Sequence, residues 1–181
     1  MKEDKRRLLM KSFIESQFSY CPLVWMFHGN RSLESRINKL HTRALRISYD
    51  DNISSFEELL IKDDSFTIHH QNIQRLMIEI FKSQNNLAPS FMKNIFPETS
   101  NYINLRHKPS FETINIKSVF NGSDTVHYIG PRIWSNIPDT IKKVETLSQF
   151  KDNITKWKPL GCICRLCKPY IQHIGYVDTV L

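Results

Sequence analysis

The chain has 181 residues, of which 40% are apolar and 24% are charged, a composition typical of a globular protein rather than a disordered one. It contains five glycines and no GxGxxG or GxxxxGK[ST] pattern, which argues against a phosphate-cradling loop. Residues 1–47 hold ten Lys or Arg and four Asp or Glu, residues 48–100 hold four and eight, and residues 101–181 hold eleven and six. Two basic segments therefore flank an acidic one, which favours a polyanionic partner.

The N-terminal segment MKEDKRRLLMKSFIESQFSY is charged and lacks a long apolar core. No window of the chain approaches the roughly 18 uninterrupted apolar residues of a membrane span, so neither a secretory signal nor a membrane partner is expected. We expect an intracellular protein, cytoplasmic or nuclear. In that reducing environment the four cysteines should not form a disulfide framework.

The pattern of residues predicts a mainly α protein. Helical composition or apolar periodicity predicts helices over residues 3–19, 33–47, 55–61, 66–83, 90–96 and 138–156. Alternating β-branched residues predict a strand over residues 111–116 and a weaker one near 125–129. We therefore expect a helical bundle over residues 1–100, a small α+β region over residues 101–160 and a Cys-rich tail over residues 161–181.

Two local patterns predict where helices begin. Ser54 and Glu57 fit a capping box, in which the hydroxyl and the carboxylate each accept a hydrogen bond from the other residue's backbone N–H. Asp63 and Asp64 form a cluster of N-cap residues ahead of the next helix.

The segment over residues 33–47 combines a stripe for burial with a stripe of positive charge. Apolar residues recur there at steps of four and three, as on a helix face that packs against a core: Leu33, Ile37, Leu40, Ala44 and Ile47. A second stripe carries the candidate nucleic-acid-binding residues Arg36, Lys39, Arg43 and Arg46. Glu34 is the sole acid in residues 31–47, so few internal salt bridges can neutralise these cations. The stripe is either a phosphate-binding surface, which His41 is close enough to join, or a solvated helix face.

Tyr49, Asp50 and Asp51 spell a sequence similar to the turn with which polymerases hold two metal ions. Such a site needs a strand on each side of a tight turn and a third carboxylate nearby. Here a basic amphipathic helix precedes the acids and a capping box follows them, so we interpret them as loop residues at a helix terminus. The chain also lacks a Gly-x-Ser-x-Gly motif and a His-Glu-x-x-His run, and it is not expected to be an enzyme.

The tail offers four candidate metal ligands. Cys164 and Cys167 have the spacing of a zinc knuckle, and His173 is close enough in sequence to reach back. Cys162 would complete a set of four, although a Cys-x-Cys pair seldom supplies two ligands beside a Cys-x-x-Cys pair. The pattern fits either a bound Zn²⁺ or free, reduced thiols in a small apolar tail.

Several segments together resemble one protein family. Residues 13–96, from FIESQFSYCPLVW to LAPSFMKNIF, resemble the region that follows the catalytic core of LINE-type, jockey-like non-LTR retrotransposon reverse transcriptases. The segments YIGPRIWSNIP, TLSQFKDNITKWKP and CICRLCKPYIQHIGYV resemble the end of the same polyproteins. The resemblance covers roughly residues 10–177, and its motifs occur in the family's order with similar spacing.

The resemblance implies the thumb and post-thumb region of an RNA-directed DNA polymerase, without the palm or the endonuclease. It implies that the basic helix grips a template–primer duplex or element RNA, and that the missing polymerase domain is a partner. Trp134, Tyr170 and Tyr176 are candidates for stacking on bases, although such tryptophans are more often core residues. The rival expectations are an interaction or structural fragment without a nucleic-acid partner, and a non-functional remnant of a decayed element.

Overall fold

The computed structural model describes residues 2–25, 31–97, 99, 111 and 125–157; for residue 23 and residues 31–34 it describes the backbone alone. These residues are mainly helical, as predicted, and no β-strand occurs among them. They fall into two compact units, Met1–Asn72 (unit 1) and Ile73–Leu181 (unit 2), which we describe separately. The region boundaries predicted at residues 100 and 160 lie outside the described residues and stay predictions.

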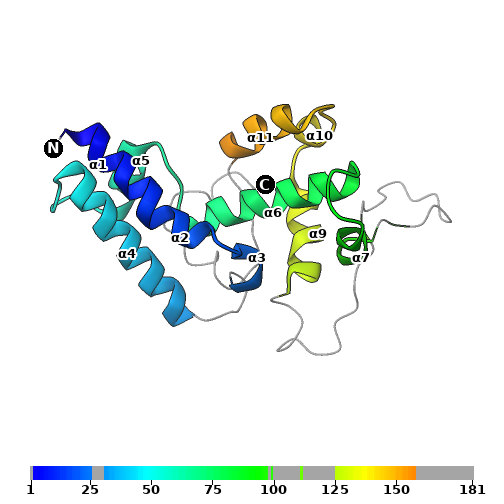
Figure 1. Ribbon diagram of the computed structural model, residues 1–181, viewed down its shortest axis with the longest axis horizontal. Coiled ribbons are helices and arrows are strands. Elements are labelled where there is room, and N and C mark those ends of the chain that lie inside the picture. Colours follow the sequence, from blue (N-terminus) through cyan, green and yellow to red (C-terminus); the bar gives the residue numbers. More distant parts are fainter. Residues whose placement is uncertain (1, 26–30, 98, 100–110, 112–124, 158–181) are drawn as a thin grey trace, which may run out of the picture. The chain divides into compact units, whose positions relative to one another are not determined.

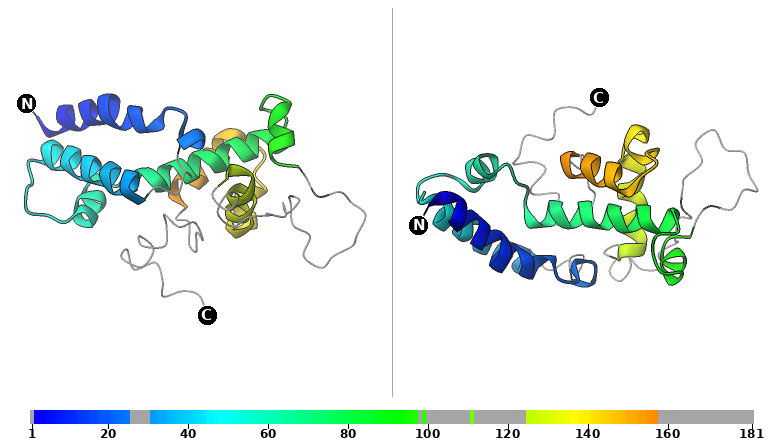
Figure 2. Two further views of the ribbon diagram at one scale, coloured as in Figure 1. Left: turned by 90° about the horizontal axis from the view of Figure 1, so that it is seen from below. Right: turned by 45° about the horizontal axis from the view of Figure 1, so that its top comes forward.

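Unit 1 is built from two long helical segments that run side by side in opposite directions (Figures 1 and 2). The first segment is continuous from α1 to α2, and the second is α4. The helices of the unit are α1 (Glu3–Met10), the single π-helical turn η1 (Lys11–Glu15), α2 (Ser16–Ser19), α3 (Pro22–Trp25), α4 (Arg31–Tyr49), α5 (Phe56–Asp63) and the first turn of α6 (Ile68–Gln84). The helices predicted over residues 3–19 and 33–47 are confirmed.

The core of unit 1 lies where α1, α4 and α5 meet. It contains Met10 from α1, Ala44, Leu45 and Tyr49 from α4, and Leu59 and Leu60 from α5, with Phe56 packed against them. Burial of these side chains is the main source of stability for so small a unit.

The buried face of α4 is rotated from the face that the apolar pattern predicted. Leu40 and Ile47, predicted to face the core, are 54% and 64% exposed. The residues that are buried at steps of three and four are Asn38, His41, Leu45 and Ser48, and all but Leu45 are polar. The apolar residues alone therefore predicted the wrong buried face: the core contacts the face of His41, Leu45 and Ser48, and not that of Leu40 and Ile47.

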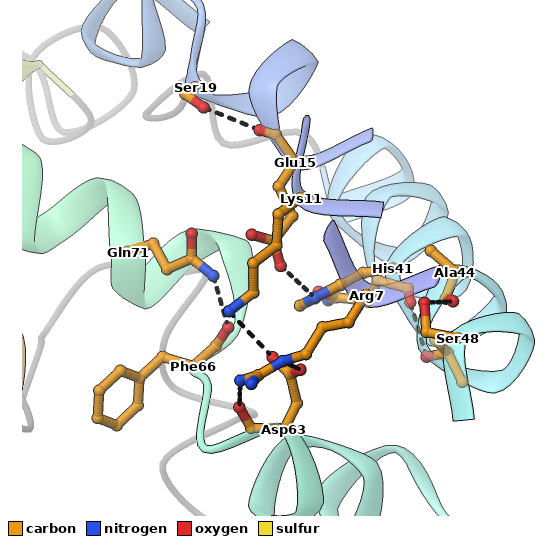
Figure 3. A network of polar contacts seen from close by, with 12 residues as sticks. Arg7, Lys11, Glu15, Ser19, His41, Ala44, Ser48, Asp63, Phe66 and Gln71 are labelled. Atoms are coloured by element: carbon orange, nitrogen blue, oxygen red, sulfur yellow. Dashed lines mark hydrogen bonds and ion pairs between the residues drawn. The ribbon is translucent and has the colours of Figure 1, made fainter. Parts of the chain in front are cut away.

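Polar contacts from the first helical segment explain this rotation. Arg6 Nε donates a hydrogen bond of 2.9 Å to the backbone oxygen of Ser48. His41 is fully buried, and its Nε2 atom lies 3.5 Å from Glu15 Oε1 (Figure 3). The expectation that His41 joins the basic face is therefore wrong, because this side chain faces η1 instead.

A buried carboxylate, Asp63, joins α1, α4 and α5. Arg7 from α1 approaches it with Nε at 2.6 Å from Oδ1, and the Nη2 atom of Arg7 donates to the Asp63 backbone oxygen (Figure 3). The Tyr49 hydroxyl donates to the same Oδ1 at 2.6 Å, and Lys11 Nζ lies 4.0 Å from Oδ2. The Asp63 side chain is 0% exposed, so these partners replace the water that an ionised carboxylate needs.

The surroundings of this cluster shift the ionisation of both Asp63 and Tyr49. Burial acts to raise the pKa of Asp63, but the Tyr49 and Ser65 hydroxyls and the Arg7 guanidinium outweigh it and hold this pKa below its ordinary value. Burial, followed by the hydrogen bond to Asp63, raises the pKa of Tyr49 to about 12. The cluster is therefore an ionised carboxylate that accepts a hydrogen bond from a neutral phenol.

The ends of α5 differ from the sequence prediction by one residue or more. The capping box is formed by Ser55 and Glu58 instead of Ser54 and Glu57. Ser54 is not free to cap the helix because its N–H and its hydroxyl both donate to the Asp51 carboxylate.

Asp63 and Asp64 end α5 and do not begin α6, so their interpretation as N-cap residues is wrong. Asp63 is the last residue of α5, and Asp64 adopts a left-handed conformation with φ of 49° at its C-cap. The start of α6 is capped by Thr67, whose Oγ1 accepts a hydrogen bond of 3.2 Å from the His70 backbone N–H.

Unit 2 packs its helices around stacked and edge-on aromatic rings. Its described helices are the rest of α6, α7 (Phe91–Ile95), α9 (Val126–Asn136), α10 (Asp139–Lys142) and α11 (Leu147–Lys156). The rings of Phe81 and Phe150 stack with centroids 4.2 Å apart, and Trp134 lies 5.8 Å from Phe150. Gln74 donates to the backbone oxygens of Thr155 and Trp157 and so satisfies carbonyl groups at the end of α11.

The weaker strand predicted near residues 125–129 is wrong, because α9 begins at Val126. Ile129, Ile133 and Ile137 are buried at helical spacing, so packing overrides the preference of β-branched residues for strands. α9 approaches α6 closely at Gly130, where an added Cβ would lie 3.2 Å from the Ile80 side chain. The strand predicted over residues 111–116 lies outside the described residues except for Phe111.

Replacing Asp63 by Asn should destabilise unit 1 by about 2–3 kcal/mol. Removing one partner of a fully buried ion pair costs roughly 3–5 kcal/mol. The cost should be lower here, because the Arg7 side chain is 38% exposed and water can solvate its charge in the variant. Urea unfolding of the full chain, followed by circular dichroism, measures the change. Asp64→Asn is the matched control, because Asp64 is exposed and Asn tolerates a left-handed conformation.

The same variant should change the acid limb of the stability curve. The depressed pKa of Asp63 stabilises the fold fully above the ordinary carboxyl value near ~4, and this contribution disappears as the pH falls through the lower folded pKa. The acid limb should therefore flatten in Asp63→Asn and persist in Asp64→Asn. At alkaline pH, the stability that the neutral phenol of Tyr49 contributes should be complete below about pH 10. It should disappear as the pH rises toward the folded-state pKa of about 12. Equal urea midpoints for the parent and Asp63→Asn would contradict the central role of this carboxylate.

Candidate nucleic-acid interface

The four predicted phosphate-binding cations lie on the side of α4 that faces away from the core. The buried face of α4 is centred near His41, Leu45 and Ser48. At about 100° per residue, Arg36, Lys39 and Arg43 point roughly opposite to this face; all three are exposed, and Arg46, on its border, is half-buried. The ten-residue step from Arg36 to Arg46 makes the cationic stripe about 15 Å long. Along the axis of a duplex, each nucleotide of one strand takes up about 3.4 Å, so this length corresponds to roughly four nucleotides.

Carboxylates in the described part of the chain do not neutralise this stripe, since none forms an ion pair with any of the four cations. The acids of the following segment have other partners. Glu58 caps α5, Asp63 binds Arg7, and Asp51 lies 3.6 Å from Lys62. The ion pairs of unit 1 therefore do not support docking of the basic helix on the acidic residues of segment 48–64.

Asp51 is held in its turn by hydrogen bonds and not by the stripe. The backbone N–H and the hydroxyl of Ser54 both donate to its carboxylate, and these bonds lower the pKa of Asp51 to about 2. A third hydrogen bond comes from the Ile53 backbone N–H. This carboxylate is thus ionised at neutral pH, and its lone pairs are largely used within the turn.

An open groove with a volume of about 490 Å³ lies along the stripe. Three of the predicted cations line it together with a hydroxyl, an apolar side chain and an amide; the six residues are Lys39, Thr42, Arg43, Arg46, Ile47 and Asn52. We refer to this set as the α4 groove. Among these lining residues there is no carboxylate.

The sequence pattern did not identify Thr42, Ile47 or Asn52 as part of a site. Ile47 had been predicted to face the core. Asn52 reaches the groove because Asp50, with φ of 54°, turns the chain back after the end of α4. The poor helix formers after Tyr49 are the signal that could have placed Asn52 beside the last turn of α4.

Arg46 has donors to spare within the α4 groove. Its Nη2 atom makes a long hydrogen bond of 3.3 Å to the backbone oxygen of Ser54. Its Nε atom is buried and has no hydrogen-bond partner. Because a guanidinium carries five N–H donors, Arg46 can bind an anionic oxygen without losing the contact to Ser54.

The other sequence-predicted residues are distributed away from this surface. Asp50 and Asp51 lie in the turn after α4, as predicted, while Tyr49 is buried and bonded to Asp63. Trp134 is 2% exposed and belongs to the aromatic core of unit 2, so its candidacy for base stacking is wrong. Tyr170 and Tyr176 lie outside the described residues.

The described residues contain neither a metal-binding cluster nor a membrane-spanning helix. Within the ranges that the structure describes, no group of three or more His, Cys, Asp or Glu is arranged to hold a metal ion. The predicted zinc ligands Cys162, Cys164, Cys167 and His173 all lie outside those ranges. No helix of the described residues has the length and apolar character needed to cross a membrane.

Comparisons with known proteins identify no relative: no family model, no curated protein and no solved structure matches the chain. The resemblance to LINE-type reverse transcriptases is therefore carried by the sequence motifs alone and stays a prediction.

Proposed function

We propose that unit 1 binds the sugar–phosphate backbone of RNA or DNA through the exposed cations of α4. The observation that carries this proposal is that Arg36, Lys39, Arg43 and Arg46 share one side of a single helix and form no ion pair with a described carboxylate. Neighbouring cations on one helix face repel one another, and a bound polyanion removes that repulsion. Binding also releases the counterions condensed on the nucleic acid, which favours the complex. Binding of this kind follows the backbone and is independent of base sequence.

The proposal assigns the chain a gripping role and no catalytic one. It fits the thumb and post-thumb region that the sequence motifs resemble, with the missing polymerase domain of a parent RNA-directed DNA polymerase as the partner that supplies chemistry. Tyr49 and Asp51, the residues that most resemble part of a polymerase site, have structural partners in Asp63 and Ser54. We further propose that residues 101–160 form a small α+β region and that the cysteine tail belongs to the same nucleic-acid-binding fragment.

The opposite face of α4 supports the proposal by holding the stripe in place. Arg6 of α1 donates to the Ser48 backbone oxygen of α4, and Glu15 of η1 approaches His41. Asp63 of α5 binds both Arg7 of α1 and Tyr49 of α4. These contacts fix the rotation of α4 about its own axis. The backbone that carries the cations is therefore rigid before binding, which reduces the loss of conformational entropy on binding.

Replacing Arg36, Lys39 and Arg43 together by Gln should weaken duplex binding and reduce its dependence on salt. Each lost phosphate contact removes about 0.9 from the slope of log affinity against log salt, so the slope should fall by roughly 3. Fluorescence anisotropy of a labelled duplex, titrated with the full chain at several salt concentrations, measures it. Arg46 is left intact because it also bonds to Ser54.

A matched control separates the stripe from overall charge. Lys93, Lys151 and Lys156 are exposed residues of unit 2, and their combined replacement by Gln removes the same charge. This control should keep most of the salt slope. If both triple variants lose the same affinity and slope, the binding depends on net charge and α4 is not the interface.

Replacing Cys164 and Cys167 by Ser tests the zinc prediction for the tail. The purified parent protein should carry one Zn²⁺ per chain by elemental analysis, and the double variant should carry none, because thiolates are the strongest ligands in the proposed set. If the parent protein carries no stoichiometric metal, the zinc prediction is wrong and the cysteines are free thiols.

A further inference from the structure

The α4 groove contains more than a row of cations. Lys39, Arg43 and Arg46 supply positive charge, and Asn52 adds an amide on the wall formed by the turn after α4. Ile47, which is 64% exposed, places an apolar side chain among these polar groups. A surface that bound only backbone phosphates would need the cations alone.

The apolar wall favours a nucleotide whose base and sugar are accessible. In a duplex the phosphates lie outside and the base faces are stacked inside, so a side chain such as Ile47 has little apolar surface to contact. An unpaired nucleotide exposes its base face and sugar, and proteins that bind single strands combine a basic groove with apolar or aromatic contacts to them. The amide of Asn52 can both donate and accept, as the polar edge of an unpaired base requires.

The groove also has the size and the free donors for such a ligand. Its volume of about 490 Å³ lies within the range of roughly 300–1,000 Å³ found for small-ligand sites. Arg46 lines the groove, and its guanidinium has further N–H donors beside the one that Nη2 gives to Ser54, so it can donate to a phosphate oxygen. The neighbouring Asp51 does not compete for the cations, because Ser54 and Lys62 occupy it.

We infer that the α4 groove holds one unpaired nucleotide, with its phosphate among Lys39, Arg43 and Arg46 and its sugar or base against Ile47. This inference rests on the proposed function and specifies it further. It makes the preferred ligand a duplex with an unpaired end, or a single strand, over a blunt duplex. The base is contacted on its face and by one amide, so selectivity among bases should be weak.

Ile47→Ser tests the inference because the change removes the apolar wall and leaves every charge in place. Anisotropy titrations of the full chain use three labelled probes: a blunt duplex, the same duplex with a short unpaired end, and a single strand. The parent should bind the unpaired-end duplex more tightly than the blunt one. In Ile47→Ser, the ratio of the two affinities should fall about fivefold, which is the scale of losing part of one aliphatic side chain's burial.

Ile53→Ser is the matched control. Ile53 is 97% exposed, lies one residue beyond Asn52 and does not line the groove, so the same chemical change there should leave all three affinities at the parent level. Asn52→Ala is a second test within the groove and should also lower the ratio. Circular dichroism confirms that each variant is folded.

The outcomes separate this inference from the proposal on which it rests. If the parent binds the blunt and the unpaired-end duplex equally, or if Ile47→Ser and Ile53→Ser behave alike, the nucleotide site is overturned while backbone binding by α4 stands. If the parent binds none of the three probes, both are overturned. A fall in the ratio that is confined to the Ile47 and Asn52 variants supports the site.

Discussion

The arrangement of unit 1 depends on one buried carboxylate. Asp63 is the last residue of α5, yet its side chain bonds to Arg7 of α1 and to Tyr49 of α4, so three helices meet at one group. An ionised carboxylate without water is strongly unfavourable, and the neighbouring guanidinium and phenol offset that cost only in this arrangement. Hydrophobic contacts around Leu45 and Leu59 have no direction of their own, whereas hydrogen bonds require a defined geometry. The carboxylate therefore determines which side of α4 faces inward and, as a consequence, which side presents its cations.

The sequence predicted most of the helices but not how α4 is rotated. Periodicity located α4 and the continuous segment over residues 3–19, because helix formers without Gly or Pro leave few alternatives. It failed for the buried face because Asn38, His41 and Ser48 are buried polar residues. For His41 and Ser48, the contacts come from the first helical segment, far away in sequence. The same limit explains the capping box, since Ser54 and Ser55 fit it equally well until Asp51 engages one of them.

The candidate site was predictable in its charges and not in its shape. Spacing of three and four placed the four cations on one side of a helix, and that geometry follows from the helix itself. The groove required knowledge of the chain reversal at Asp50, which brings Asn52 beside Arg46 and Ile47. In unit 2, packing of Ile129 and Ile133 determined a helix where local preference favoured a strand. In both cases contacts between elements decided the outcome, and a pattern within one element cannot contain them.

The single π-helical turn of η1 sets the register between the two polar anchors of the first segment. Arg7 and Glu15 are eight residues apart, so in a regular α-helix they would point roughly 80° away from each other. The wider turn over Lys11–Glu15 takes up this angular excess, and Arg7 reaches Asp63 while Glu15 approaches His41. Regular α-helical winding of the same residues would instead turn one of these two side chains away from its partner. This local irregularity therefore lets one continuous helical segment reach α5 through Arg7 and α4 through Glu15 at the same time.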